Sequence, residues 1–319
     1  QAQLEAVIKD WDNYESRINE VLQGQAGAPL SSVRLQAPVP RPGQLVCLAG
    51  NYIEPDHPTK ETFNAFLKSN TSVMGQNAVV ELPDTEASVF HFEPELALVI
   101  GKRASNLNPD EALKHVFGYT QFIDVSARGL PGGFFLGKSW HTFGPMGPAI
   151  VTADEVDPQN LDIKLWVSGD LRQDLSTTDM GRSVYEVVEF VSWITTLKAG
   201  DVVSSGTNHV GLGPIQDGDT IEMEISGFGP KLKVNVKDDW KRTWPREPLS
   251  RMETPRASNS SVMAPTPTPR VTRPPDIWSS VAAYFASSTG LWYGRTKTDV
   301  PNVTFEVVAA RYDRVDIGW

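Results

Sequence analysis

Two glutamates stand two residues apart at the start of an apolar run, Phe92-Glu93-Pro94-Glu95-Leu96-Ala97-Leu98-Val99-Ile100-Gly101. In an extended chain, residues i and i+2 point to the same face, so the carboxylates of Glu93 and Glu95 are expected to lie side by side. A third carboxylate, Asp124, stands in a second apolar stretch over residues 119–128. Three acidic oxygen donors favour a hard divalent cation.

A solvated sheet edge is the alternative interpretation of the two glutamates. The pattern Glu-x-Glu also occurs on exposed strands, where the carboxylates bind nothing. Pro94 suits an edge strand or a bulge better than a central strand, because proline cannot donate a hydrogen bond to a neighbouring strand. The local sequence leaves both interpretations open, and the choice depends on the motifs in the rest of the chain.

Four segments, taken in order, resemble the fumarylacetoacetate hydrolase family. They are residues 91–101 with the two glutamates, residues 118–128 with Asp124, the stretch 137–148, and residues 200–207. The resemblance covers about residues 40 to 245. It implies an α+β fold that is mainly β, a mixed β-sandwich roll with peripheral helices. It also implies a homodimer.

The resemblance implies that Glu93, Glu95 and Asp124 bind Mg²⁺ or Mn²⁺, ions that prefer octahedral oxygen ligands. Lys138 is implied as the cation beside this metal. The implied substrate is a small 2-oxo or 2,4-dioxo acid, whose C3–C4 bond breaks as electrons pass into a metal-chelated carbonyl group.

Three further residues are predicted to bind the substrate, of which the resemblance implies Thr207. Thr207 follows a glycine and is expected to donate a hydrogen bond to the substrate. Ser139 follows Lys138 directly, and His209 lies two residues beyond Thr207. A structural role for His209 within its loop is the alternative.

The group that would activate water is the least regular part of the pattern. In hydrolytic relatives a His-Glu pair stands four and seven residues after the asparagine of an Asn-Tyr motif. Here Asn51-Tyr52 is present, but those two positions hold prolines. His57 and Glu61, spaced i and i+4, are the candidates in their place, with a helix expected over residues 60–67. A site without such a pair is the alternative.

Three functions follow from these motifs. The first is a metal-dependent hydrolase of carbon–carbon bonds in acylpyruvate-like acids. The second is a decarboxylase or keto–enol isomerase on the same scaffold, which needs no activated water. The third is a non-catalytic homologue that binds a metal or ligand. Product identity separates the first two functions, and metal-dependent turnover excludes the third.

One other motif suggests nucleotide binding. Residues 132–139 match the phosphate-loop pattern, a glycine followed four residues later by Gly-Lys-Ser. A phosphate loop must open a helix whose N-terminus faces the phosphates. Glycines and prolines over residues 144–148 argue against such a helix, so we expect no nucleotide site.

The composition narrows the range of partners. The 319 residues carry 29 Lys and Arg against 39 Asp and Glu, a net charge of −10, and an acidic chain repels nucleic acid. The single cysteine, Cys47, excludes an internal disulfide framework. No apolar stretch reaches about eighteen residues, so we expect no membrane contact and a cytoplasmic protein.

The chain divides into four parts by pattern. Residues 1–42 combine an amphipathic helix, expected over 3–22, with a connector, and residues 43–246 form the catalytic domain. Residues 247–276 are a linker rich in Pro, Ser and Thr. Residues 277–319 form a C-terminal segment of no assigned role. Within the catalytic domain we expect helices over 109–117 and after Ser183, and strands over 220–225 and 232–236.

Overall fold

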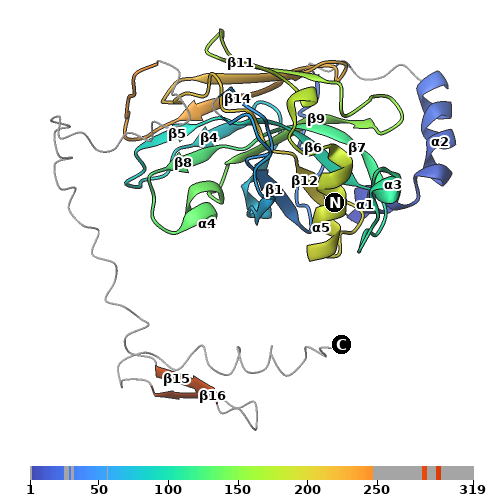
Figure 1. The fold of residues 1–319 in the computed structure, drawn as a ribbon, viewed down its shortest axis with the longest axis horizontal. Helices are drawn as coiled ribbons and strands as arrows, with labels where there is room; N and C mark the ends of the chain where they lie inside the picture. Colours follow the sequence, from blue (N-terminus) through green and yellow to red (C-terminus); the bar gives the residue numbers. More distant parts are fainter. Residues whose placement is uncertain are drawn as a thin grey trace. The chain divides into compact units, whose positions relative to one another are not determined.

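The computed structural model describes residues 2–24, 29, 32–55, 57–246, 282–285 and 292–295 (Figure 1). The chain forms two compact units, residues 1–257 and residues 258–319. In the second unit, the described residues are two antiparallel strands, β15 (Ala282–Phe285) and β16 (Trp292–Arg295). The expected linker 247–276 lies outside the described residues, and the four-part division remains a prediction.

The largest sheet in the first unit has seven strands in the order β2-β1-β12-β6-β7-β9-β3. Strand β6 lies at its centre and pairs antiparallel with both β12 and β7. The strands are β1 (Leu45–Ala49), β2 (Asn64–Leu67), β3 (Val73–Met74), β6 (Pro94–Ile100), β7 (Val116–Ile123), β9 (Gly144–Thr152) and β12 (Val202–Ser204).

A second sheet of five strands has the order β11-β10-β13-β14-β4. Buried and more exposed residues alternate along β10, β13 and β14, which is the pattern of strands with one face on a core. The strands are β4 (Val79–Glu81), β10 (Asp162–Val167), β11 (Asp170–Ser176), β13 (Thr220–Ile225) and β14 (Leu232–Lys237). A small third sheet pairs β5 (Val89–His91) with β8 (Ser126–Arg128).

The main core lies between the two larger sheets. Leu96 and Leu98 of β6 share one hydrophobic cluster with Leu165 of β10 and Met223 of β13. On the other face of β6, Ala97 and Val99 join a second cluster that includes Ile8 near the N-terminus. Every residue of β6 is therefore buried, and the glutamates at its start are buried with it.

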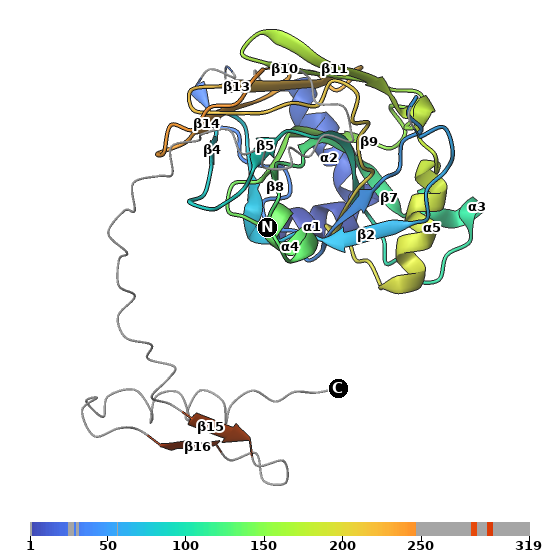
Figure 2. The same cartoon turned by 60° about the vertical axis from the view of Figure 1, so that its left-hand side comes forward.

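The helices lie at the periphery of the sheets (Figures 1 and 2). They are α1 (Ala2–Lys9), α2 (Trp11–Gly24), α3 (Pro109–Ala112), α4 (Gly133–Lys138) and α5 (Val184–Ile194). The expected fold class, mainly β with peripheral helices, is confirmed. None of the helices in the described part of the chain has the length and apolar character needed to cross a bilayer.

Several local expectations hold. The helix after Ser183 begins with the predicted capping box, in which Ser183 and Glu186 each bind the backbone N–H group of the other. The expected strands over 220–225 and 232–236 form β13 and β14.

Three helix predictions need correction. The helix expected over 3–22 is interrupted at Asp10, giving α1 and α2. The helix expected over 109–117 ends at Ala112, continues as a 3₁₀ turn over Leu113–His115, and gives way to β7. The helix expected over 60–67 is wrong, because residues 64–67 form strand β2. Antiparallel pairing with β1 holds this segment extended.

Candidate metal centre and cavity

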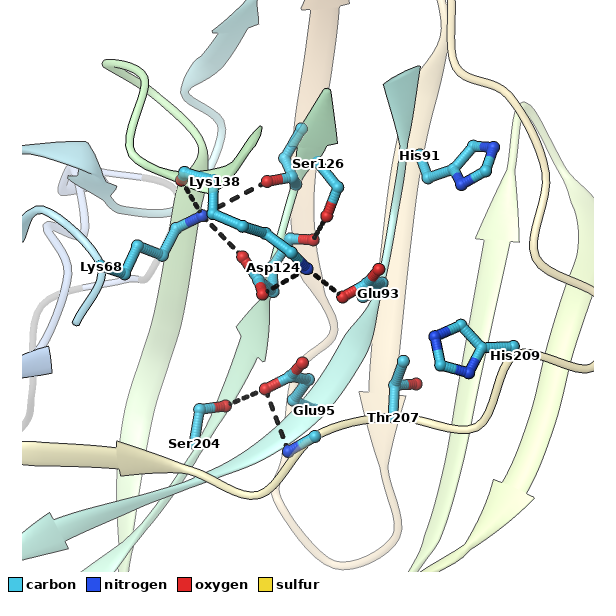
Figure 3. Close-up of polar contacts among 12 residues, drawn as sticks. Lys68, His91, Glu93, Glu95, Asp124, Ser126, Lys138, Ser204, Thr207 and His209 are labelled. Carbon is cyan, nitrogen blue, oxygen red and sulfur yellow. Dashed lines mark hydrogen bonds and ion pairs between the residues drawn. The ribbon is translucent and has the colours of Figure 1, made fainter. Parts of the chain in front are cut away.

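Three carboxylates meet where strands β6 and β7 pair. Glu93 precedes β6, Glu95 lies within it, and Asp124 follows β7. The antiparallel register places Pro94 opposite Ile123, and the Asp124 N–H donates to the Glu93 carbonyl at 2.8 Å. One carboxylate oxygen from each of the three residues lies within 4.8 Å of the others, and all three side chains are buried (Figure 3).

Two cations bind Glu93. Lys138, the last residue of α4, donates from Nζ to Glu93 Oε2, and Arg128, at the end of β8, donates from Nη2 to Glu93 Oε1. The Lys138 ammonium also donates to Asp124 Oδ2 at 2.7 Å, so it links two of the three carboxylates. The turn that carries Lys138 is therefore fixed against the carboxylate cluster.

A second buried lysine, Lys68, follows strand β2. Its Nζ donates to Asp124 Oδ1 at 2.6 Å, to the Val125 carbonyl at 3.3 Å and to the carbonyl of Lys138 (Figure 3). Among the described residues, Lys68, Arg128 and Lys138 form ion pairs with Asp124 and Glu93. With Glu95 counted as ionised, the formal charges of these three cations and of the three carboxylates sum to zero.

Glu95 differs from its two neighbours. Its Oε2 accepts hydrogen bonds from the Ser204 hydroxyl and from the Gly206 N–H at 3.2 Å. None of the ion pairs formed by the described residues involves Glu95. Ser204 ends strand β12 and Gly206 lies in the loop beyond it, so Glu95 ties the carboxylate cluster to that loop.

The pKa values reflect this difference. Burial would raise the pKa of Glu93, but the charges of Lys138 and Arg128 outweigh it and hold this pKa well below its usual range. Burial, followed by the charges of Asp124 and Glu93, raises the pKa of Glu95 well above its usual range. Burial opposes the charge of Lys138, yet Asp124 and Glu93 raise the pKa of its ammonium.

A cavity of about 320 Å³ opens beside this cluster. Glu93, Glu95 and Lys138 line one part of its wall, and Thr207 and His209, on the loop after β12, line another. Figure 3 shows Thr207 and His209 on the side of Glu93 away from Lys68.

Two further basic side chains, Arg128 and His91, line the cavity. Burial, assisted by the nearby Arg128, lowers the pKa of His91 to about 3, so its imidazole is neutral near pH 7. The positive charge on this part of the wall therefore comes from Arg128.

The predicted water-activating pair is only partly assembled. His57 Nδ1 lies 3.8 Å from Glu61 Oε1, beyond hydrogen-bond distance, and the two side chains are 34% and 37% exposed. Glu61 lines the cavity, whereas His57 is not among the described residues that do so. The catalytic role of this pair remains a prediction.

Of the predicted substrate-binding residues, two lie at the cavity. The Thr207 hydroxyl donates to the Asn208 carbonyl at 3.2 Å, and His209 Nδ1 lies 2.8 Å from Glu54 Oε1. Ser139 lies elsewhere in the described structure. Its hydroxyl accepts from the Ser69 N–H at 3.1 Å, which joins the end of α4 to the segment after β2.

The phosphate-loop pattern forms a different structure from a nucleotide site. Helix α4 runs through the pattern itself, from Gly133 to Lys138, so Lys138 ends the helix instead of preceding it. Its ammonium is occupied by Glu93 and Asp124. Strand β9 follows six residues after Lys138.

Sequence reasoning missed three residues around the cavity. Lys68 directly follows the helix expected over residues 60–67. Its contact with Asp124 depends on strand β2, which forms there instead. Arg128 was part of a recognised motif but received no role. Glu54 carried no motif. A lone charged residue directly after the apolar pair Phe66-Leu67 was the available signal for Lys68.

The donor set fits a divalent cation such as Mg²⁺ or Mn²⁺. All three groups are carboxylates, the oxygen ligands that both ions prefer, and the cavity beside them leaves room for a further ligand. Burial raises the pKa of Glu95 most, and the nearby charges of Asp124 and Glu93 raise it further, so a bound cation would relieve part of this strain on its ionised form. Metal binding is therefore supported by the chemistry of the site.

Comparison with known proteins identifies the family that the chain resembles. The family described as fumarylacetoacetate (FAA) hydrolase C-terminal matches residues 7–236. A maleylpyruvate hydrolase of Aquipseudomonas alcaligenes is 35% identical over 242 residues, covering 70% of this chain and 83% of the relative. An oxaloacetate tautomerase of Bacillus subtilis is 36% identical over 222 residues, covering 63% and 72%.

The chain is also similar to solved structures of related enzymes. The maleylpyruvate hydrolase of Sphingobium sp. SYK-6, in complex with manganese (II) ion and pyruvate, superimposes with a TM-score of 0.67 at 34% identity. The match covers 74% of this chain and 85% of that chain. Since the family match spans most of the chain, this protein belongs to the fumarylacetoacetate hydrolase family.

Proposed function

We propose that the protein is a divalent-metal-dependent hydrolase that cleaves the C3–C4 bond of a 2,4-dioxo acid resembling an acylpyruvate. The single observation that carries this proposal is the position of Lys138, hydrogen-bonded to two of three clustered carboxylates at a cavity wall. The carboxylates Glu93, Glu95 and Asp124 would hold Mg²⁺ or Mn²⁺. When bound, that ion would draw electrons from the keto group as the carbon–carbon bond breaks.

The side chains of the cavity supply the remaining requirements. The Lys138 ammonium adds a fixed positive charge where an enolate would develop, and such preorganised charge is commonly the largest contribution to a rate enhancement. Arg128 provides a cation on the cavity wall for a carboxylate group. Thr207 offers a hydroxyl that can exchange its bond to a backbone carbonyl for one to the substrate.

A keto–enol tautomerase is the second candidate. The separation and exposure of His57 and Glu61 favour it, because a tautomerase needs a metal and enolate stabilisation but no activated water. A relative that is an oxaloacetate tautomerase supports the same reaction class. Decarboxylation would also use these groups. The metal-binding residues, Lys138 and Thr207 serve all of these reactions equally.

Product analysis distinguishes the candidates. Acetylpyruvate and oxaloacetate are incubated separately with the protein and Mn²⁺, with EDTA as the control, and the products are followed by NMR. Acetate plus pyruvate from acetylpyruvate supports the hydrolase. Accelerated interconversion of oxaloacetate tautomers without hydrolysis supports the tautomerase, and carbon dioxide release supports the decarboxylase. No Mn²⁺-dependent conversion of either compound would contradict an enzymatic role.

A further inference from the structure

A buried carboxylate, Glu54, holds His209 at the wall of the cavity. The Glu54 side chain is 4% exposed, and its Oε1 accepts the backbone N–H of His209 at 3.1 Å. The same oxygen lies 2.8 Å from Nδ1 of the His209 ring. Two contacts from one residue to one oxygen fix both the backbone and the ring of His209.

This arrangement determines which ring nitrogen carries the proton. A carboxylate oxygen is an acceptor, so Nδ1 of His209 is the donor in this pair. Nε2 then keeps its lone pair when the imidazole is neutral. The ring lines the cavity, and Figure 3 shows it turned toward Glu93 and Thr207. A basic nitrogen therefore faces the group of residues expected to hold the metal and substrate.

The pair His57 and Glu61 has a weaker geometry. Its closest ring nitrogen and carboxylate oxygen are 3.8 Å apart, and the His57 and Glu61 side chains are 34% and 37% exposed, against 19% for His209. A general base must be oriented and within reach of the proton that it removes. Among the described histidines, His209 alone combines a hydrogen-bonded, buried carboxylate partner with a position on the cavity wall.

We propose that His209, oriented by Glu54, is the general base that activates the attacking water. This inference rests on the proposed hydrolase function. His209 would be the catalytic residue, because it contacts the reacting water. Glu54 would be a positioning residue, which selects the ring tautomer and stabilises the charged imidazolium.

The step balances as follows. Nε2 of His209 takes one proton from water, and the water oxygen forms a bond to C4 of the 2,4-dioxo acid while the π pair of the C4 carbonyl moves onto its oxygen. That pair re-forms the carbonyl when the carbon–carbon bond breaks. The C3–C4 bond then breaks, and its electron pair moves toward the C2 carbonyl to give an enolate. The imidazolium of His209 returns its proton to C3. The products are a carboxylic acid and the shortened 2-oxo acid. The reaction consumes one water molecule and needs no oxidant or reductant.

The test compares single variants of the full chain with acetylpyruvate at saturating Mn²⁺. His209→Ala and His209→Gln should lower kcat by roughly 10²- to 10⁴-fold, the usual contribution of a positioned base. Glutamine still offers an N–H group to Glu54, so the second variant separates loss of the base from loss of the loop contact. His141→Ala, which changes an exposed histidine outside the cavity, is the matched control.

Two readouts separate catalysis from structure. Added imidazole should restore part of the activity of His209→Ala, because a free base can enter the space left by the ring. Glu54→Gln keeps an acceptor oxygen but loses the negative charge, and should lower kcat at least about tenfold with KM little changed. Calorimetric Mn²⁺ affinity should stay within about threefold of wild type in every variant, which also verifies a folded site.

Each alternative result has a distinct meaning. If wild type cleaves acetylpyruvate while both His209 variants retain its kcat, the base assignment is wrong and the hydrolase function stands. A raised KM at unchanged kcat also overturns the assignment and leaves His209 as a substrate-binding residue. Loss of activity in His57→Ala alone would return the role to the His57–Glu61 pair. If wild type yields no acetate and pyruvate, the hydrolase function and the assignment both fail.

Discussion

Replacing Glu95 by glutamine should stabilise the metal-free protein. Glu95 is buried near Asp124 and Glu93, and it is held by the Ser204 hydroxyl and the Gly206 N–H without an ion pair among the described residues. Burial and its neighbours raise its pKa. Folding therefore imposes a cost on this carboxyl near pH 7, either by keeping it charged in the interior or by protonating it.

The size of that cost has a ceiling. Protonating a carboxyl group whose ordinary pKa is about 4.3 costs about 3.7 kcal/mol at pH 7, from about 1.36 kcal/mol per pH unit. A folded protein in which the ionised form is more costly takes up a proton instead. Glutamine keeps an acceptor oxygen for Ser204 and Gly206, so we expect Glu95→Gln to raise the free energy of unfolding by about 1–3 kcal/mol.

The pH dependence gives the sign of the effect. At pH values below about 4.3 this carboxyl is protonated in both the folded and unfolded states, and the two proteins should have nearly equal stability. As the pH rises, the unfolded wild-type chain loses the proton first, so the advantage of Glu95→Gln should grow toward pH 7. Urea unfolding in EDTA, followed by tryptophan fluorescence from pH 5 to 8, measures this difference.

Bound metal should make wild type more stable than Glu95→Gln, the reverse of the order in the metal-free proteins. Saturating Mn²⁺ stabilises a folded protein that binds it, by about 2.7 kcal/mol at one hundred times Kd, and Glu95→Gln should lose most of that gain. Glu93→Gln is the contrasting variant. This substitution deprives Arg128 and Lys138 of their shared anion. It should therefore lower the free energy of unfolding of the metal-free protein by up to about 3–5 kcal/mol. Equal or lower stability of Glu95→Gln in EDTA at pH 7, or an undiminished response to Mn²⁺, would refute this reasoning.

Three other changes have defined outcomes. Lys138→Met should retain Mn²⁺ binding by calorimetry but lower turnover roughly 100-fold or more, and unchanged kcat would exclude a role for this ammonium in the reaction. Lys68→Met leaves Asp124 with one cation, Lys138, and should lower the free energy of unfolding in EDTA by as much as about 3–5 kcal/mol, a loss that Mn²⁺ should partly offset. Deletion of residues 258–319 should leave Mn²⁺-dependent turnover within about threefold of the full chain, because every described cavity residue precedes Ser258. An insoluble truncated protein would show that the first unit does not fold independently of these residues.

The parts of the fold that follow from local chemistry were predictable. The capping box at Ser183 and the alternation in β13 and β14 depend on residues close in sequence. The position of Glu93 and Glu95 on one side of an extended segment also depends on strand geometry alone. Their closeness to Asp124 required the pairing of β6 with β7, which the sequence indicated only through the family resemblance.

The remaining features depend on contacts between distant segments. A helix is expected over residues 60–67, but residues 64–67 pair with β1 as a strand, and Lys68, directly after this strand, binds Asp124, 56 positions along the chain. Glu54 and His209 are 155 positions apart, and no local pattern links them. His57 is a candidate from the sequence because it follows the Asn51-Tyr52 motif. A backbone bridge joins it to Glu54, whose buried side chain contacts His209 instead.

The formal neutrality of the carboxylate cluster affects the order in which a metal and an anion bind. Three carboxylates matched by Lys68, Arg128 and Lys138 exert little net attraction on an incoming anion. A divalent ion changes that formal balance to +2, which is equal in size and opposite in sign to the charge of oxalate or of a fully ionised enolised oxo acid. We therefore expect the metal to bind first and the anion second. By reciprocity, a dianion that binds the loaded site more tightly than the empty one would tighten the affinity for the ion to the same degree.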